Sequence, residues 1–211
     1  KLVLIRNAVD CSRFHPRLRG EFGAEVRQQV SIPREATVFV LVGSGFERKG
    51  VGAFLRALAR RKDPAWALVV GKDKRSARYR ALAARLGIAD RVRFVGGVSD
   101  VRPYLAAADA FVLPTLYDPF PNAALEAMAA GLPVVTGAKC GAAEIVREGE
   151  SGFVRDALDV AGIAQCLDLL DVPAARRMGE AARETVSTLT PEAMARDYLA
   201  LYERLLAGKL G

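Results

Sequence analysis

The chain has 211 residues, of which 51% are hydrophobic and 26% charged, so it can bury a core and does not read as a disordered chain. Its net charge is +7, carried by 24 arginines and only 7 lysines; this excess indicates either partners that carry phosphate or carboxylate, or a GC-rich genome. Its three cysteines form no CxxC pair and it has one histidine, which argues against a disulfide framework or zinc site and favours a reducing compartment.

Short β-branched segments alternate with helical segments along the chain. Strands are predicted over Leu2–Ile5, Val38–Val42, Ala67–Val70, Arg91–Val95, Ala110–Leu113 and Pro133–Thr136. Helices are predicted between the strands over Val51–Arg61, Ser76–Leu86, Val101–Ala107 and Ala123–Ala130, and after them over Leu158–Leu170, Ala174–Val186 and Pro191–Leu206. This alternation predicts one α/β domain with a doubly wound, Rossmann-like parallel sheet, whose ligands bind at the carboxyl ends of the strands.

The two ends of the chain carry further signals. The sequence starts at Lys1 rather than Met and shows no signal peptide, so we expect a start that has been cut. No apolar run reaches the roughly 18 residues that a membrane-spanning helix needs. The last helix bears an apolar stripe that we expect to pack on the core rather than form an exposed interface, made of Met194, Tyr198, Leu201, Tyr202 and Leu205.

A glycine-rich loop with two cations, residues 42–50, joins a predicted strand to a predicted helix. Gly43 and Gly45 allow a ligand to approach the backbone closely, and the helix start offers free N–H groups. Arg48 and Lys49 add positive charge where the helix dipole is already positive, which a bound anion would explain. The loop lacks the Walker A spacing, and Arg48 stands where GxGxxG has its third glycine. The alternative is a plain turn with solvated basic residues; either way we expect a solvent-facing loop.

Two carboxylates stand on either side of the next helix start. Asp118 precedes a proline-containing loop, and the helix begins near Asn122. Glu126 lies one turn further and is the one charge in a helix of Ala, Leu and Met residues. A carboxylate on such a helix needs hydrogen-bond donors, which sugar hydroxyls can supply. The alternative is a solvated glutamate on an exposed face.

These motifs resemble those of a known family. Asp118-x7-Glu126 resembles the E-x7-E motif of retaining glycosyltransferases of family 4 (glycosyl transferases group 1), with Asp in place of the first Glu. Residues 48–50 are similar to that family's diphosphate-binding loop, and residues 7–10 (Asn-Ala-Val-Asp) to the NGVD entry into its C-terminal domain. Within the family, residues 43–51, 70–74 and 140–141 most resemble the lipopolysaccharide core glucosyltransferase I type, which uses UDP-glucose.

The resemblance implies one half of a GT-B fold, with residues 1–211 as the nucleotide-sugar-binding C-terminal domain of a two-domain enzyme whose N-terminal acceptor domain is absent. The donor would be a UDP-sugar, UDP-glucose being favoured, with no metal and no further cofactor. Arg48 and Lys49 would neutralise the diphosphate and stabilise the leaving nucleotide, Gly45 would approach the phosphates, Asp118 would hold a sugar hydroxyl, and Glu126 the ribose. Further donor contacts are expected at Phe120, Pro121, Asn122, Ala123 and Leu125, and near the base at Val98 and at Lys72 or Arg75.

The same resemblance implies a lipid-linked or oligosaccharide acceptor, a cytoplasmic location, and peripheral association with the inner membrane in the full-length protein. An isolated domain is expected to be inactive. One alternative is a family-4 transferase for another glycan or small acceptor with a different sugar nucleotide. A second alternative, suggested by the +7 charge, is a nucleic-acid-binding domain. We disfavour it, and nucleic acid as a partner, because the arginines are scattered and no recognition helix or stacking platform is visible.

Overall fold

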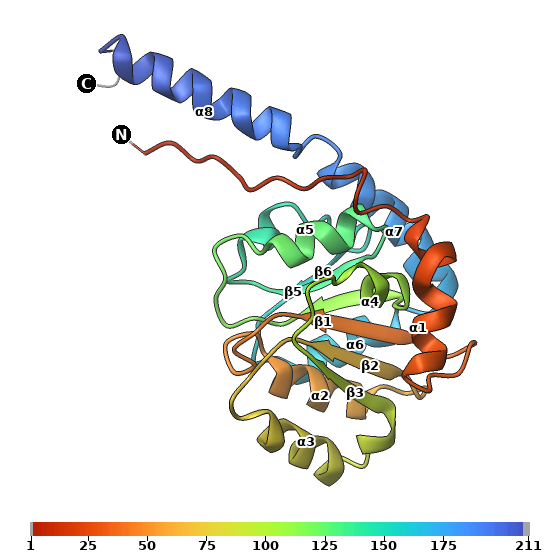
Figure 1. Ribbon diagram of the computed structural model, residues 1–211. Helices are drawn as coiled ribbons and strands as arrows, with labels where there is room; N and C mark the ends of the chain where they lie inside the picture. The colour runs from red at the N-terminus through yellow and green to blue at the C-terminus, as the bar shows by residue number, and fades with distance from the viewer. Residues whose placement is uncertain (1, 209–211) are drawn as a thin grey trace.

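Six parallel strands form one sheet in the computed structural model, which describes residues 2–208 (Figure 1). The order across the sheet is β3-β2-β1-β4-β5-β6, which is a doubly wound arrangement. The strands are β1 (Val38–Val42), β2 (Trp66–Val70), β3 (Val92–Gly96), β4 (Ala110–Leu113), β5 (Val134–Gly137) and β6 (Gly152–Arg155). The predicted fold class is confirmed, and β1 to β5 each lie within one residue of the predicted bounds.

Helices cover both faces of this sheet (Figure 1). They are α1 (Ala24–Gln29), α2 (Val51–Arg60), α3 (Ser76–Arg85), α4 (Arg102–Ala106), α5 (Asn122–Ala129), α6 (Val160–Asp168), α7 (Val172–Val186) and α8 (Pro191–Leu206). Helix α2 packs against α3 and α6, while α5 packs against α7, and α4 packs against a π-helical turn at Arg19–Gly23 that precedes α1. Short 3-10 turns stand at Ala89–Arg91 and Gly141–Glu144.

The core lies between the sheet and its two helical layers. Every residue of β4 and β5 is buried, as are the first four residues of β1. Strands covered on both faces carry apolar residues on both sides, so their sequences show no alternation. Phe39, Phe54 and Phe111 are fully buried within this core.

Two expectations about the strands are wrong. Leu2–Ile5 is not a strand: within the described chain it pairs with nothing, and Leu2 and Leu4 are 95% and 65% exposed. Strand β6 was not predicted, because it is short, begins with glycine and forms only by pairing with β5. Gly152 has to be glycine there, since a Cβ would lie 2.0 Å from the carbonyl oxygen of Val134. Helix α1 and the turn before it were also missed.

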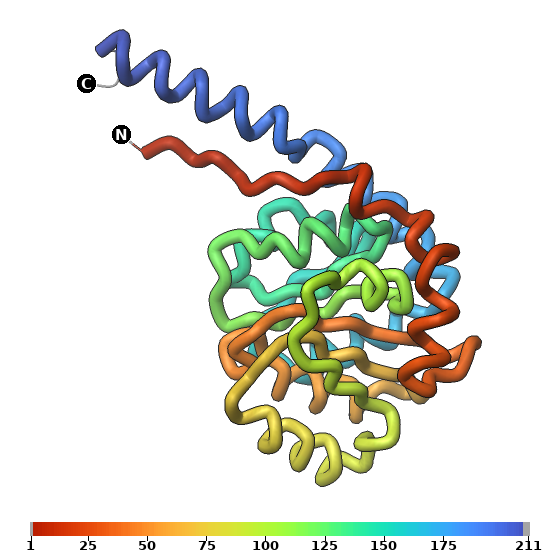
Figure 2. The backbone as a smooth tube through the Cα atoms, in the orientation of Figure 1, coloured from red at the N-terminus to blue at the C-terminus, as the bar shows by residue number. Residues whose placement is uncertain are grey.

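The expectation that the stripe on α8 packs on the core is also wrong. The helix begins at Pro191, capped by Thr190 whose hydroxyl accepts a hydrogen bond from the N–H of Ala193 (3.2 Å), as its sequence predicts. It then runs away from the sheet, alongside the N-terminal segment (Figure 2). Tyr198 and Tyr202 are 41% and 55% exposed, and no residue of α8 is buried within the described chain. Within residues 2–208, no helix combines the length and apolarity that a membrane span requires.

Candidate functional site

The loops that follow the parallel strands meet at one edge of the sheet, and the β1–α2 loop is built into that edge by two residues. Phe46 is 1% exposed, and its ring lies 5.5 Å from that of Tyr79 and 6.3 Å from that of Phe94. Gly50 has φ +74° at the start of α2, and a Cβ there would lie 1.9 Å from the carbonyl oxygen of Pro114. Only glycine fits this backbone and this close approach, so the loop has a fixed path.

An open cleft of about 660 Å³ lies between the β1–α2 loop and the loop that leads from β4 into α5. It brings together several residues predicted to form the site from sequence positions far apart. Its lining comprises Val42, Gly43, Ser44, Arg48, Lys49, Tyr117, Asp118, Pro119, Pro121, Asn122 and Ala123.

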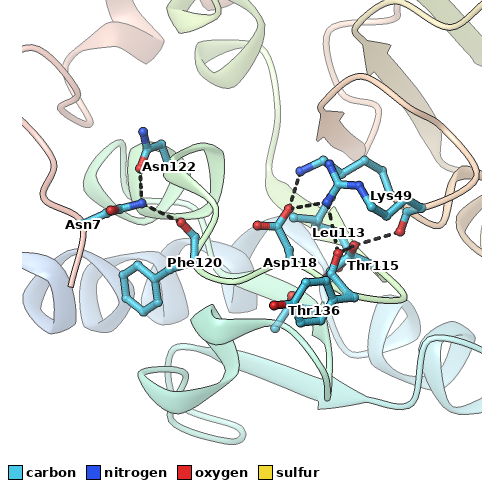
Figure 3. Close-up of polar contacts among 10 residues, drawn as sticks. Asn7, Lys49, Leu113, Thr115, Asp118, Phe120, Asn122 and Thr136 are labelled. Atoms are coloured by element: carbon cyan, nitrogen blue, oxygen red, sulfur yellow. Dashed lines mark hydrogen bonds and ion pairs between the residues drawn. The ribbon is translucent and has the colours of Figure 1, made fainter. Parts of the chain in front are cut away.

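The charged cluster in this cleft consists of Arg48, Lys49 and Asp118 (Figure 3). Oδ2 of Asp118 accepts a hydrogen bond from Nζ of Lys49 (2.5 Å) and from Nη1 of Arg48 (3.1 Å). The side chains of Lys49 and Asp118 are only 10% and 9% exposed, whereas that of Arg48 is 50% exposed. The expectation of a solvent-facing loop is therefore wrong for Lys49, because Asp118 pairs with it and the β4–α5 loop covers it.

Buried hydroxyls tie the two loops together, and no sequence pattern predicts them. Thr115, which is 0% exposed, donates its hydroxyl to the carbonyl oxygens of Arg48 (2.8 Å) and Tyr117 (3.1 Å). The N–H of Leu116 donates to the same carbonyl of Arg48 (2.9 Å). On the neighbouring strand, Thr136 donates its hydroxyl to the carbonyl oxygen of Leu113 (3.1 Å; Figure 3). These bonds fix the backbone that carries both cations against the backbone that carries Asp118.

The N-terminus of α5 faces the cleft and is held by a residue from the far end of the chain. Nδ2 of Asn7 donates to the carbonyl oxygen of Phe120 (2.9 Å) and to Oδ1 of Asn122 (3.0 Å; Figure 3). The first N–H groups of a helix have no acceptor within that helix, so this end of α5 offers donors and positive potential to a ligand. Sequence analysis noted Asn7 as part of the entry motif and assigned it no contact.

Glu126 is half-buried on α5 and, unlike Asp118, has no ion-pair or hydrogen-bond partner for its carboxylate among residues 2–208. Burial raises the pKa of this carboxyl above its ordinary value, Arg13 opposes the shift and Asp100 adds to it. The side chain does not line the cleft. This setting differs from the freely solvated face considered as the alternative, and it leaves the carboxylate able to accept hydrogen bonds from a ligand.

A second open cavity, of about 550 Å³, adjoins the β1–α2 loop and is lined by Lys72, one of the residues that the sequence predicts near the base. The side chain of Lys72 lies over Gly97, where a Cβ would come within 2.4 Å of it. Arg80, which sequence analysis did not select, stacks over the Phe94 ring with its guanidinium carbon 4.7 Å from the ring centre. Both residues line this cavity, so a planar, polar ligand would find an aromatic wall with cations beside it.

Besides Glu126, five of the residues expected to contact the donor line neither the cleft nor the cavity that contains Lys72: Gly45, Arg75, Val98, Phe120 and Leu125. Arg75 pairs with Glu47 and does not line the cavity that contains Lys72. Val98 packs partly against the core and lines neither the cleft nor this cavity. Leu125 is fully buried, so only its backbone could meet a ligand.

Similarity to known proteins identifies the family of this chain. The family model of glycosyl transferases group 1 matches residues 23–185. LpsE of Rhizobium meliloti (strain 1021), a lipopolysaccharide core biosynthesis glycosyltransferase, is 34% identical over 186 residues, which are 86% of this chain and 54% of LpsE. The lipopolysaccharide glucosyltransferase WaaG of Escherichia coli (strain K12) is 37% identical over 132 residues, which are 61% of this chain and 35% of WaaG.

Solved structures give the same fold. Anabaena HepE in complex with UDP-glucose superposes with a TM-score of 0.80 at 23% identity, covering 97% of this chain and 57% of HepE. The chain thus spans about half the length of HepE and of LpsE. The sheet order and these matches correspond to the C-terminal half of a GT-B glycosyltransferase. The chain belongs to the glycosyl transferases group 1, the retaining family 4.

Proposed function

We propose that this chain binds the nucleoside-diphosphate sugar of a retaining glycosyltransferase, with Arg48 and Lys49 holding the diphosphate. The observation that carries the proposal is the cleft in which both cations face the N-terminus of α5. Two cations and a helix N-terminus together form a site for an anion with more than one charge. Gly45 supports the assignment. It has φ +76°, and no atom lies within 4 Å of the place where its Cβ would stand, so a ligand could approach the backbone there.

The same groups would stabilise the reaction. When the glycosidic bond to the diphosphate breaks, negative charge grows on the leaving oxygen. Arg48 and Lys49 are already positioned for that charge, so no reorganisation is needed as it develops. The backbone of Phe120, Pro121, Asn122 and Ala123 would line the sugar, Asp118 would accept a sugar hydroxyl, and Glu126 would accept the ribose hydroxyls.

UDP-glucose is the proposed donor. The name of WaaG specifies glucosyl transfer, and HepE shows that a protein of this fold holds UDP-glucose. The cavity of Lys72, Phe94 and Arg80 would take the base.

The acceptor would be a lipid-linked or core oligosaccharide at the cytoplasmic face of a membrane. We propose that it binds mainly to a second domain outside residues 1–211, because the relatives are about twice as long as this chain. The reaction would then take place where the two domains face each other across the cleft.

A thermal-shift panel tests the donor. A ligand at about 100 times its Kd stabilises the folded state by about 2.7 kcal/mol, which gives a clear rise in Tm. We expect UDP and UDP-glucose to raise the Tm of the chain more than GDP-mannose or ADP-glucose at equal concentration. Greater stabilisation by a guanine or adenine nucleotide would overturn the choice of donor, and no stabilisation by any nucleotide sugar would overturn the proposed function.

A double substitution tests the phosphate contacts. Changing Arg48 and Lys49 together to Ala should abolish stabilisation by UDP. The matched control is Arg176 and Arg177 changed to Ala, which removes the same charge from an exposed part of α7. If UDP stabilises the first variant as well as the control, the diphosphate binds elsewhere.

A further inference from the structure

Asp118 forms ion pairs with Arg48 and Lys49, the two cations to which the proposed function assigns the diphosphate. Its Oδ2 lies 2.5 Å from Nζ of Lys49 and 3.1 Å from Nη1 of Arg48. The Lys49–Asp118 pair is about nine-tenths covered, so water does little to screen it. Charge-assisted bonds of this kind are the strong ones in proteins, and this cluster holds two of them on one oxygen.

A diphosphate that enters the cleft meets this carboxylate at close range. The carboxylate and the phosphate oxygens would repel each other across the short contacts with Lys49 and Arg48. The backbone of Asp118 is held by hydrogen bonds with Lys139 and Gly141, so the change would be a rotation of its side chain into the open 660 Å³ space that it lines. A carboxylate released from the cations would face the place assigned to the donor sugar.

We propose that Asp118 is an exchangeable counter-ion: it neutralises Lys49 and Arg48, is displaced by an incoming diphosphate, and then accepts a hydroxyl of the donor sugar. This inference rests on the proposed function. Displacing the ion pair weakens the binding of every diphosphate, and only an intact donor offsets that loss with a sugar hydroxyl. The exchange therefore disfavours the nucleotide product relative to the nucleotide sugar and promotes product release.

The test is Asp118→Asn, measured by calorimetry with UDP and with UDP-glucose. Removing the competing charge should tighten UDP binding by about tenfold. UDP-glucose should gain less than UDP or become weaker, because the amide is a poorer acceptor for its hydroxyl. The ratio of Kd for UDP to Kd for UDP-glucose should fall accordingly. The matched control is Asp63→Asn, which changes the net charge equally at an exposed position beyond the C-terminal end of α2.

The outcomes separate the inference from the function beneath it. If the natural chain binds neither ligand, the proposed function fails. If it binds both and Asp118→Asn binds UDP with unchanged or lower affinity, the counter-ion exchange is wrong and the proposed function stands.

A crystal structure of the natural chain with UDP gives an independent measurement, which does not depend on how the variant folds. Phosphate oxygens should replace Asp118 beside Nζ of Lys49, with the carboxylate moved beyond hydrogen-bond distance. A UDP complex that keeps the Asp118–Lys49 contact would overturn the exchange.

Discussion

Three charged side chains near the cleft have different environments, and their energetics follow from that. Lys49 and Asp118 satisfy each other in a nearly dry contact, whereas Glu126 is half-buried without a hydrogen-bond donor among the described residues. Removing one member of a buried pair leaves the other desolvated, and removing an unpartnered buried charge relieves a penalty. Substitutions at the two places should therefore change stability in opposite directions.

Lys49→Ala should reduce the free energy of unfolding by about 1–3 kcal/mol, because it leaves the Asp118 carboxylate buried with Arg48 as its remaining partner. Arg48→Ala is the control: its side chain is half exposed, so its pair contributes only about 0–1 kcal/mol. Urea denaturation of both variants without ligand measures the difference. Equal stability losses would contradict the burial assigned to Lys49.

Glu126→Gln should weaken UDP and UDP-glucose alike, by about one to two orders of magnitude, if the carboxylate accepts ribose hydroxyls. Calorimetry with both ligands measures this. A loss confined to UDP-glucose would move Glu126 from the ribose to the sugar, and unchanged affinity for both would remove it from the site.

The same variant should change the pH dependence of stability. The folded state raises the pKa of Glu126, so between the ordinary value of 4.5 and the raised one it binds more protons than the unfolded chain. The unfolding free energy of the natural chain therefore falls as pH rises through that window. Glu126→Gln removes the contribution of Glu126 to this decrease, because glutamine does not titrate. Without ligand, the variant should gain stability relative to the natural chain as pH rises above 4.5, as denaturation at several pH values would reveal.

At the scale of elements, glycine geometry and one long-range contact hold the cleft together. Gly50 and Gly45 have nearly the same φ, +74° and +76°, but Gly50 lies against the carbonyl of Pro114 while Gly45 faces open space. Asn7 reaches α5 from a segment that has no regular structure of its own. The close approach of Gly50 to Pro114 and the contacts of Asn7 with α5 each join elements that are distant in sequence.

Gly50→Ala should destabilise the fold far more than Gly45→Ala. Both variants carry the left-handed strain of about 1–2 kcal/mol, and only the first also drives a methyl group into backbone 1.9 Å away. Urea denaturation compares the two. We expect Gly45→Ala to remain folded and to lose affinity for UDP, because its methyl group stands where the phosphates approach; similar stabilities for both variants would contradict the close packing at Gly50.

Asn7→Ala should weaken UDP-glucose more than UDP. The two hydrogen bonds it removes contribute about 0.5–1.5 kcal/mol each, and they orient the start of α5, where the sugar is proposed to lie. Arg6→Ala is the control, since Arg6 pairs with Glu144 on the exposed surface. Calorimetry with both ligands decides, and an equal response of the two variants would separate Asn7 from the sugar site.

At the scale of the whole molecule, the exposed face of α8 and the apolar N-terminal residues stand outside the packed core. Leu199 and Leu205 are 60% and 53% exposed on that helix, and Leu2 and Leu4 are 95% and 65% exposed. The N-terminal segment and α8 both extend away from the sheet (Figure 1). A helix earlier in the chain would bury such residues on the sheet, as α5 does. The α/β core is complete without α8, since α7 already covers α5.

We expect residues 1–211 alone to bind UDP and to transfer no sugar, because the acceptor would bind mainly to a second domain. Incubation with UDP-[14C]glucose and a core oligosaccharide acceptor measures transfer, with calorimetric UDP binding as the control for folding. Robust transfer by this chain would show that it carries the acceptor site itself.

The sequence by itself determined the sheet and the edge at which a ligand would bind. Runs such as Val38–Val42 and Ala110–Leu113 are too apolar for anything but buried strands, and parallel strands put the loops that follow them on one edge. The resemblance of Asp118-x7-Glu126 to a family motif then selected two of these loops. Local pattern sufficed because these signals lie within single elements.

Only the tertiary structure decided which residues of those loops contact one another. Residues that lie 67 to 115 positions apart in the chain form three of these contacts. Asp118 pairs with Lys49, the hydroxyl of Thr115 bonds to the backbone of Arg48, and Asn7 bonds to the start of α5. Pattern along the chain reports how apolar a neighbourhood is, and does not report which distant group will cover a charge. The same reason accounts for β6, which exists through its pairing with β5, and for α8, whose amphipathic sequence is compatible with either a buried or an exposed stripe.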